Sequence, residues 1–207
     1  MELLLIRHAL PVRKELEVGA ADPELSEIGL AQAEHLGRYL ASEHLDAVYS
    51  SPMRRARETA APITADRGLE VVIEPDVAEF DRDSSSYVPV EEFKAADDPR
   101  WRDLLTGAWD GPETQEEFSR RTVDAIEAIV ERHRGGRVAV VCHGGVVNAY
   151  ATRVLALPVE GRGFFYPNYT SIHRIAAASS GERSVVTLNE TSHLRGTGLP
   201  MGMFQQG

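Results

Sequence analysis

Short apolar runs alternate along this chain with longer stretches in which apolar residues recur at helical spacing. The runs at residues 2–6, 47–50 and 137–142 are bounded by polar or turn-forming residues, which is typical of buried strands. Residues 69–73 predict a further strand, and a final pair of strands is expected at 170–175 and 184–189.

Helix signals fall between these runs. Ser26 is a candidate N-cap for a helix that extends to about residue 42. Ser51 and Pro52 have the residue types favoured at the N-cap and at the first helical position. A second helix is therefore predicted from Ser51 to about Arg67, before Gly68.

Two more helices are expected later in the chain. Thr114 and Glu117 form a capping box that opens a long helix, which ends before Gly135. The helix after the strand at 137–142 is predicted over 145–155. Five positions of the long helix define its apolar side: Phe118, Thr122, Ala125, Ile126 and Ile129.

Strands that alternate with helices are typical of an α/β fold, in which a mostly parallel sheet lies between two layers of helices. We therefore expect a three-layer α/β/α architecture formed by a single domain over residues 1–190. Residues 79–111 are rich in Asp, Ser, Pro and Trp and lack clear periodicity, so we expect them to form an inserted lid. The glycines beyond Thr191 predict a loose C-terminal tail over 191–207.

Composition narrows the range of partners. The net charge of −10 makes general affinity for nucleic acid or an anionic membrane unfavourable. The single cysteine, Cys142, excludes an intramolecular disulfide, and because it ends an apolar run we expect it in the core. No segment has the pattern of a signal peptide or a transmembrane helix, so we expect a cytoplasmic protein, and the sequence leaves a homodimer open.

Two histidines stand where a predicted strand ends and a turn begins. Arg7-His8 follows the first strand, and His143-Gly144-Gly145 follows a much later one. In open α/β sheets, ligands bind at the edge formed by the carboxyl ends of the strands. Glycine lets the backbone approach a ligand closely, and the N–H groups of a helix start can bind an oxyanion. Two imidazoles and an arginine at this edge favour phosphoryl transfer through a histidine.

His8 is the candidate nucleophile. An imidazole attacks phosphorus only through an unprotonated nitrogen, and the neighbouring Arg7 disfavours the imidazolium form by like-charge repulsion. On its own, a histidine at a strand end is as often without a catalytic role.

Arg54, Arg55 and Arg57 lie in the first turns of the helix predicted after Ser51. Cations near a helix N-terminus oppose the helix dipole, so a bound phosphate would explain their presence there. A solvated basic face is the alternative interpretation of this cluster.

No metal site is expected. The remaining histidines have no spacing typical of metal ligands; they are His35, His44, His133, His173 and His193. We therefore expect neither a metal nor an organic cofactor, and arginines would supply the positive charge that phosphoryl transfer needs.

Four ordered motifs resemble those of the histidine phosphatase superfamily, branch 1, which has the phosphoglycerate-mutase-like fold. Arg7-His8-Ala9 is similar to the family's Arg-His-Gly, and residues 143–145 match its late His-Gly-Gly. Residues 25–33 resemble the motif Leu-Thr-x-x-Gly-x-x-Gln-Ala, and residues 51–60 resemble Ser-x-x-x-Arg-Ala-x-x-Thr-Ala. The similarity extends from residue 2 to about residue 190.

The resemblance implies a role for each matched residue. His8 would become phosphohistidine, and Arg7, Arg55 and His143 would hold the phosphate. The family's general acid is usually a glutamate after the third strand, which corresponds to Glu79. Such an acid must be protonated to donate to the leaving oxygen, so its pKa should be raised.

Other positions extend or complicate this assignment. Asp81 and Asp83 are close enough in sequence to compete with Glu79 for the acid role. Lys14 stands where many members have a phosphate-binding asparagine, so Lys14 or Arg13 is a candidate substitute. Gly144 is expected to bring its backbone to the phosphate.

The leading hypothesis is a metal-independent phosphatase that hydrolyses a small phosphorylated substrate through a phosphohistidine on His8. A mutase of the same fold and a non-catalytic phosphate-binding module are the alternatives. The long phosphoglycerate-mutase signature after the first histidine is absent, which favours the phosphatase. We expect substrate specificity to reside in residues 80–111.

Overall fold

The computed structural model describes residues 1–98, 113–157 and 166–202. Its centre is a six-stranded sheet with the strand order β4-β3-β6-β1-β7-β8. Four of these strands are mutually parallel: β1 (Glu2–Arg7), β3 (Ala47–Ser50), β4 (Val71–Ile73) and β6 (Arg137–Cys142). The other two form an antiparallel pair at one side: β7 (Ile172–Ala177) and β8 (Arg183–Glu190).

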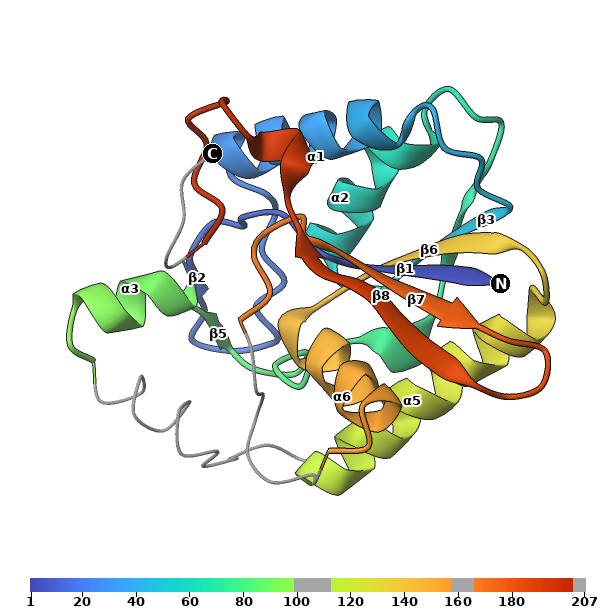
Figure 1. Ribbon diagram of the computed structural model, residues 1–207. Helices are drawn as coiled ribbons and strands as arrows, with labels where there is room; N and C mark the ends of the chain where they lie inside the picture. The colour runs from blue at the N-terminus through green and yellow to red at the C-terminus, as the bar shows by residue number, and fades with distance from the viewer. Residues whose placement is uncertain (99–112, 158–165, 203–207) are drawn as a thin grey trace.

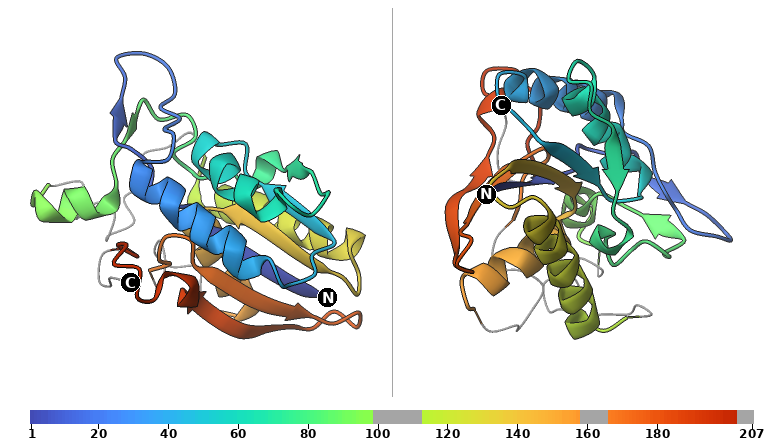
Figure 2. Two further views of the ribbon diagram at one scale, coloured as in Figure 1. Left: turned by 90° about the horizontal axis from the view of Figure 1, so that it is seen from above. Right: turned by 90° about the vertical axis from the view of Figure 1, so that its right-hand side faces the viewer.

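Helices cover both faces of this sheet (Figures 1 and 2). One face is covered by α1 (Glu27–Leu40) and α2 (Arg54–Thr64). The other is covered by α5 (Gln115–Arg132) and α6 (Gly144–Val154). The predicted three-layer α/β/α fold with a mostly parallel sheet is therefore confirmed.

The side chains of β1 alternate between the two cores. Leu4 and Ile6 belong to the cluster that packs on α1 and α2. Leu3 and Leu5 belong to the cluster on the α5 and α6 side. Because successive side chains of a strand point to opposite faces, a strand covered on both faces must be apolar at every position. This explains why the first strand is an unbroken apolar run.

Several short elements lie beyond the carboxyl end of β1. Figure 1 shows β1 running from the N-terminus toward a two-stranded sheet of β2 (Lys14–Glu15) and β5 (Ser86–Tyr87), with α3 (Val90–Ala95) beside it. Of the predicted insertion at 79–111, the structure describes residues 79–98, which form turns, β5 and α3. Residues 99–111 lie outside the described residues, and the role of the segment as a lid stays a prediction.

Two predicted helix starts are confirmed and one is wrong. Ser26 caps α1 by accepting a hydrogen bond from Gly29 N, and Thr114 caps α5 with both bonds of a capping box. In contrast, α2 begins at Arg54 after Met53, with no side-chain cap. Ser51 stands before the cap position, and its hydroxyl accepts from Met53 N at 3.3 Å and lies 2.8 Å from Nε2 of His143.

The C-terminal segment differs from the loose tail that its glycines predict. A 3₁₀ turn, η2 (Ser192–Leu194), buries Leu194 completely. Farther on, the Gln32 amide donates to Pro200 O at 2.5 Å, and Tyr169 N donates to Met201 O at 2.7 Å. These long-range bonds hold the segment against the fold in a way that local composition does not reveal. Residues 203–207 lie outside the described part.

The described helices include none that is both long and apolar enough to cross a membrane.

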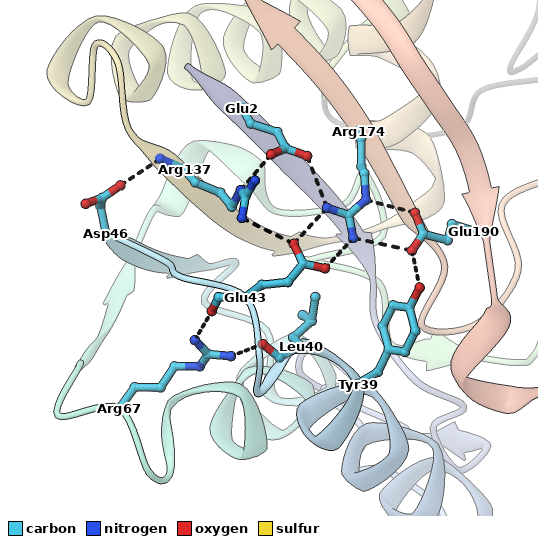
Figure 3. A network of polar contacts seen from close by, with 9 residues as sticks. All are labelled: Glu2, Tyr39, Leu40, Glu43, Asp46, Arg67, Arg137, Arg174 and Glu190. Carbon is cyan, nitrogen blue, oxygen red and sulfur yellow. Dashed lines mark hydrogen bonds and ion pairs between the residues drawn. The ribbon is translucent and has the colours of Figure 1, made fainter.

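A network of ion pairs ties the sheet to the loop that follows α1 (Figure 3). Arg174 of β7 donates to Glu43 at 2.6 Å, to Glu190 at 2.8 Å and to Glu2 at 3.1 Å. Arg137 of β6 joins it through Glu2 at 2.6 Å. Only 12% of the Arg174 side chain is exposed, so three carboxylates share one largely buried guanidinium.

Replacement of Arg174 should destabilise the fold. Arg174→Met leaves three partly buried carboxylates without their shared partner, so we expect the free energy of unfolding to fall by about 2–4 kcal/mol. The hydrogen bond from Arg174 holds the pKa of Glu43 below its ordinary value of 4.5. This contribution is therefore present above about pH 4.5 and is lost as the pH falls through the lowered pKa of Glu43. Urea unfolding at pH 7 and at pH 3.5 measures both effects.

Arg134→Met is the matched control. Arg134 also binds a glutamate, Glu131, but both side chains are more than half exposed. Exposed ion pairs contribute at most about 1 kcal/mol, so this variant should unfold close to wild type. Equal losses in the two variants would contradict a special role for the Arg174 network.

Candidate active site

The parallel pairing of β1 with β6 brings the two strand-end histidines together. Arg7 lies opposite Cys142 in the register, so His8 and His143 leave the sheet at the same level. Their ring centroids are 5.1 Å apart, and both rings are buried. The prediction that the two imidazoles share one edge of the sheet is therefore confirmed by the register and the distance.

His8 presents a bare nitrogen to this site. Its Nδ1 lies 2.7 Å from the carbonyl oxygen of Ala9, and because a carbonyl can only accept, Nδ1 must carry the hydrogen. Nε2 therefore keeps its lone pair. Burial, Arg55 and then Arg7 hold the pKa of His8 well below its ordinary value. The neutral form is as predicted, but burial and Arg55 contribute more to it than the neighbouring Arg7.

Arg7 is held by aromatic rings and a carbonyl. Its Nη1 donates to Pro167 O at 2.6 Å. The guanidinium carbon lies 4.1 Å from the ring centroid of Tyr169 and 5.1 Å from that of Tyr166. Cation–π contacts of this kind are strongest when the cation is desolvated, and only 7% of Arg7 is exposed. They fix the guanidinium beside the histidines.

Arg55 is the one buried member of the arginine cluster at the start of α2. It is 1% exposed, whereas Arg54 and Arg57 face solvent. Its Nη2 donates to Asp81 at 2.8 Å, and its guanidinium carbon lies 4.5 Å from the ring centroid of Tyr87. The interpretation as a solvated basic face thus fits Arg54 and Arg57, whereas Arg55 belongs to the buried site.

Several buried nitrogens in this cluster have no partner among the described residues: Arg7 Nε, Arg55 Nε, Arg55 Nη1 and His143 Nδ1. Burying a donor without a partner costs about 1–3 kcal/mol and more when the group is charged. Arg55 and Arg7 also lower the pKa of both imidazoles, which shows that their charges act on both rings. Such an arrangement is suited to an anion with several acceptor oxygens, such as a phosphate.

Glu79 lies beside the first residues of α6, directly after His143. Its Oε2 accepts from Gly145 N at 2.8 Å, and its Oε1 accepts from Phe80 N at 3.1 Å. Burial and then Asp81 raise the pKa of Glu79 to about 7. A Cβ at Gly145 would stand 2.3 Å from Glu79 Oε1, so a larger residue there would displace the carboxyl group from this position. Near neutral pH this carboxyl group can both give and take a proton.

The competing acids are placed differently. Asp81 is engaged by Arg55, and Asp83 is mostly exposed beside Arg82. Their contacts favour Glu79 over either aspartate as the proton donor.

The two remaining phosphate-binding candidates also differ. A Cβ on Gly144 would lie 3.9 Å from Arg7 Nε, which puts the backbone of Gly144 next to an unpartnered donor. The ammonium of Lys14 donates instead to Asp22 O at 3.2 Å and lies 3.9 Å from Glu24. The structure therefore does not bring Lys14 to the buried arginines and histidines. Arg13 likewise contacts Glu15 and Glu92 on the exposed surface.

The described residues contain no group of three or more His, Cys, Asp or Glu side chains placed to hold a metal ion. Two of the remaining histidines are buried with hydroxyl partners. His173 contacts Ser171, and His193 contacts Thr170, each at 2.9 Å. Cys142 is fully buried as predicted, and burial raises the pKa of its thiol, so it is a core residue.

Comparison with known proteins identifies the family. The family model of the histidine phosphatase superfamily (branch 1) matches residues 3–191. Phosphoserine phosphatase 1 of Hydrogenobacter thermophilus is 31% identical over 94% of this chain and 94% of its own length. The metal-independent phosphoserine phosphatase of Arabidopsis thaliana is 31% identical over 78% of this chain and 71% of its own length.

The chain belongs to branch 1 of the histidine phosphatase superfamily.

Solved structures support the same fold. A phosphoserine phosphatase mutant from Entamoeba histolytica, in complex with phosphoserine, superposes with a TM-score of 0.73 over 93% of this chain and 98% of its own, at 22% identity. A putative alpha-ribazole-5'-P phosphatase from Escherichia coli gives 0.73 over 92% and 98%, at 25% identity. The chain is a phosphoric monoester hydrolase of the histidine phosphatase family.

In this histidine phosphatase, the motif at 25–33 holds the loop that follows His8. The Ser26 hydroxyl and backbone N–H both donate to Leu10 O, and the Gln32 side chain accepts from Leu10 N at 2.8 Å. A Cβ on Gly29 would stand 2.0 Å from the same carbonyl. Ser26 and Gln32 thus fix both backbone polar groups of Leu10, and Gly29 leaves room for its carbonyl.

Sequence reasoning missed the residues that support the two arginines. Glu91 of α3 accepts hydrogen bonds from the hydroxyls of Tyr166 and Tyr169, and these rings lie against Arg7. Tyr87 of β5 stacks on Arg55. The aromatic cluster just before β7 was a visible signal, but nothing in the local pattern pointed from Glu91 or Tyr87 to the arginines.

Replacement of Glu91 should weaken phosphate binding. Glu91→Ala removes the shared acceptor of two tyrosines that support Arg7, so we expect the inhibition constant of inorganic phosphate to rise about tenfold, equivalent to ~1.4 kcal/mol. Competition assays with a chromogenic phosphomonoester measure this constant. Glu92→Ala is the control, because Glu92 is the next residue of α3 and pairs with the exposed Arg13 instead of the two tyrosines. An equal change in both variants would contradict the supporting role of Glu91.

Proposed function

We propose that this histidine phosphatase transfers the phosphoryl group of a small monoester to Nε2 of His8 and then to water, without a metal ion. The observation that carries the proposal is the buried pair of imidazoles, 5.1 Å apart, among arginine donors that have no partner in the described residues. One ring offers a lone pair for attack, and the unpartnered donors are suited to the phosphate oxygens.

The first step forms a bond between Nε2 of His8 and phosphorus and breaks the ester bond to the leaving oxygen. The leaving oxygen takes the proton of Glu79, whose pKa of about 7 leaves a useful fraction of the acid form near neutral pH. Arg7, Arg55 and His143 donate to the equatorial oxygens, where negative charge is spread in the transition state.

In the second step Glu79 acts as a base instead of an acid. Glu79, now ionised, accepts a proton from water as the water oxygen attacks phosphorus. The bond to His8 breaks, inorganic phosphate leaves, and Glu79 is again an acid. The same group serves both steps because the two reactions are mirror images about the phosphoenzyme.

The substrate is proposed to be a small phosphorylated molecule, with phosphoserine as the first compound to assay. Relatives named phosphoserine phosphatase support this choice, since two of them are 31% identical to this chain. A cytoplasmic location and a homodimer remain predictions from the sequence.

Loss of the nucleophile should abolish turnover. We expect His8→Ala to release no phosphate from phosphoserine above background, while its circular dichroism spectrum matches wild type. Wild type quenched during turnover in EDTA should carry an acid-labile phosphoryl group that the variant lacks. Full activity of His8→Ala would contradict the mechanism, and loss of wild-type activity in EDTA would contradict metal independence.

The mutase alternative is tested with 3-phosphoglycerate as the substrate. Release of inorganic phosphate instead of an isomer distinguishes the phosphatase from the mutase.

The acid role of Glu79 can be measured through the leaving group. An alkoxide needs a proton, whereas nitrophenolate hardly does, so Glu79→Gln should slow phosphorylation by an alkyl phosphate roughly 10²–10⁴-fold and by 4-nitrophenyl phosphate far less. In wild type, phosphorylation by the alkyl phosphate should decline as the pH rises through about 7, because the acid form of Glu79 is then lost. Rapid-quench single-turnover kinetics report this step alone.

Asp81→Asn is the control for this test. It removes the charge of the neighbouring carboxylate but leaves Glu79 in place. A leaving-group effect that appears in Asp81→Asn and not in Glu79→Gln would transfer the acid role to Asp81.

A further inference from the structure

His143 has a contact that the mechanism above does not explain. Its Nε2 lies 2.8 Å from the hydroxyl oxygen of Ser51, and both side chains are completely buried. Ser51 follows β3 directly, and its backbone N–H donates to Val141 O of the neighbouring strand at 2.9 Å. The hydroxyl is therefore held at a fixed position beside the imidazole.

The direction of this hydrogen bond follows from the partners of Ser51. Its oxygen already accepts a weak bond from Met53 N at 3.3 Å. Among the described residues, Nε2 of His143 is the acceptor within reach of the hydroxyl hydrogen. If Nε2 instead carried the hydrogen and donated, the buried hydroxyl hydrogen would lose its acceptor. The hydroxyl therefore donates, and Nε2 accepts.

This direction determines which nitrogen of His143 carries the hydrogen. Burial first, and then Arg55, keep the pKa of His143 well below its ordinary value, so the ring is neutral and carries one hydrogen. With Nε2 as acceptor, that hydrogen is on Nδ1, which is buried and has no partner in the described part of the chain. A donor is left for the phosphate instead of a lone pair that would repel it.

We propose that Ser51 is a positioning residue that holds His143 in the Nδ1–H tautomer and so makes the second imidazole a hydrogen-bond donor to the substrate phosphate. The inference rests on the proposed function, because it assigns the phosphate as the acceptor of Nδ1–H. It also gives the two imidazoles different roles. His8 donates its Nδ1 hydrogen to Ala9 O and presents a lone pair, whereas His143 accepts from Ser51 and presents a hydrogen.

The tautomer can be observed without any reaction. In protein labelled with ¹⁵N-histidine at pH 8, two-bond ¹H–¹⁵N correlation spectra distinguish a protonated ring nitrogen from a bare one. We expect His143 to show a protonated Nδ1 and a bare Nε2, with its signals assigned by their loss in His143→Gln. In Ser51→Ala the Nδ1–H form should lose its dominance to a mixture with the Nε2–H form.

Ser50→Ala is the matched control. Ser50 is equally buried and its hydroxyl donates to Ser51 O at 2.9 Å, whereas the hydroxyl bonded to His143 is that of Ser51. This variant also removes one buried hydroxyl, and it should keep the wild-type tautomer. Ser51→Cys, which retains a weaker donor of similar size, should restore part of the Nδ1–H signal.

Kinetics complete the test. Ser51→Ala weakens a single phosphate donor, so we expect phosphorylation to slow about tenfold, less than the full loss of an oxyanion donor. The effect should be equal for alkyl and nitrophenyl phosphates, because the donor acts on the phosphate and not on the leaving group. This equality separates it from the Glu79 effect.

Three results would overturn the proposal: an Nε2–H tautomer of His143 in wild type, an unchanged tautomer in Ser51→Ala, or a changed tautomer with unchanged phosphorylation. A failure of the phosphatase mechanism itself is recognised separately. It would appear as the absence of an acid-labile phosphoryl group on His8, whatever the tautomer of His143.

Discussion

β1 and β6 pair in parallel with Arg7 opposite Cys142, so the chain leaves both strands at the same level and the next residue of each is a histidine. β3 pairs with the other side of β6, which places Ser51 one step beyond the same edge. Three segments distant in sequence thus reach one point because parallel strands end together. The arginines, the acid and the supporting tyrosines are all arranged around this meeting point.

Around these strand ends the protein buries charges that it does not fully neutralise. Arg55 binds Asp81, and Arg7 relies on aromatic rings and a carbonyl, yet both keep donors without a partner in the described residues. Incomplete satisfaction of buried polar groups is unfavourable for the free enzyme. A phosphate that accepts from these groups recovers that free energy. The same burial keeps His8 neutral and raises the pKa of Glu79, so one physical condition prepares both residues for the roles proposed for them.

The ion-pair network on the face of the sheet that α1 covers follows a different rule. There Arg174 and Arg137 are matched by the carboxylates of Glu2, Glu43 and Glu190, and the network closes on itself (Figure 3). These paired charges connect the strands to the loop that follows α1. The contrast between matched charges in this network and unpartnered donors around the two histidines distinguishes the stabilising part of the molecule from the proposed reactive part.

The sequence by itself determined the strands and helices with strong periodicity, the caps at Ser26 and Thr114, and the place of His8 and His143 at strand ends. These features depend on neighbours within a few residues, which local patterns encode. Only the tertiary structure decided that Arg55 is buried while Arg54 is solvated, that Lys14 binds Asp22 and Glu24, and that residues 192–202 pack on the fold. It likewise turned Ser51 from an expected helix cap into the partner of His143. Each of these outcomes depends on a contact between segments far apart in the chain. A local pattern does not specify which distant residue will become the partner of a given side chain.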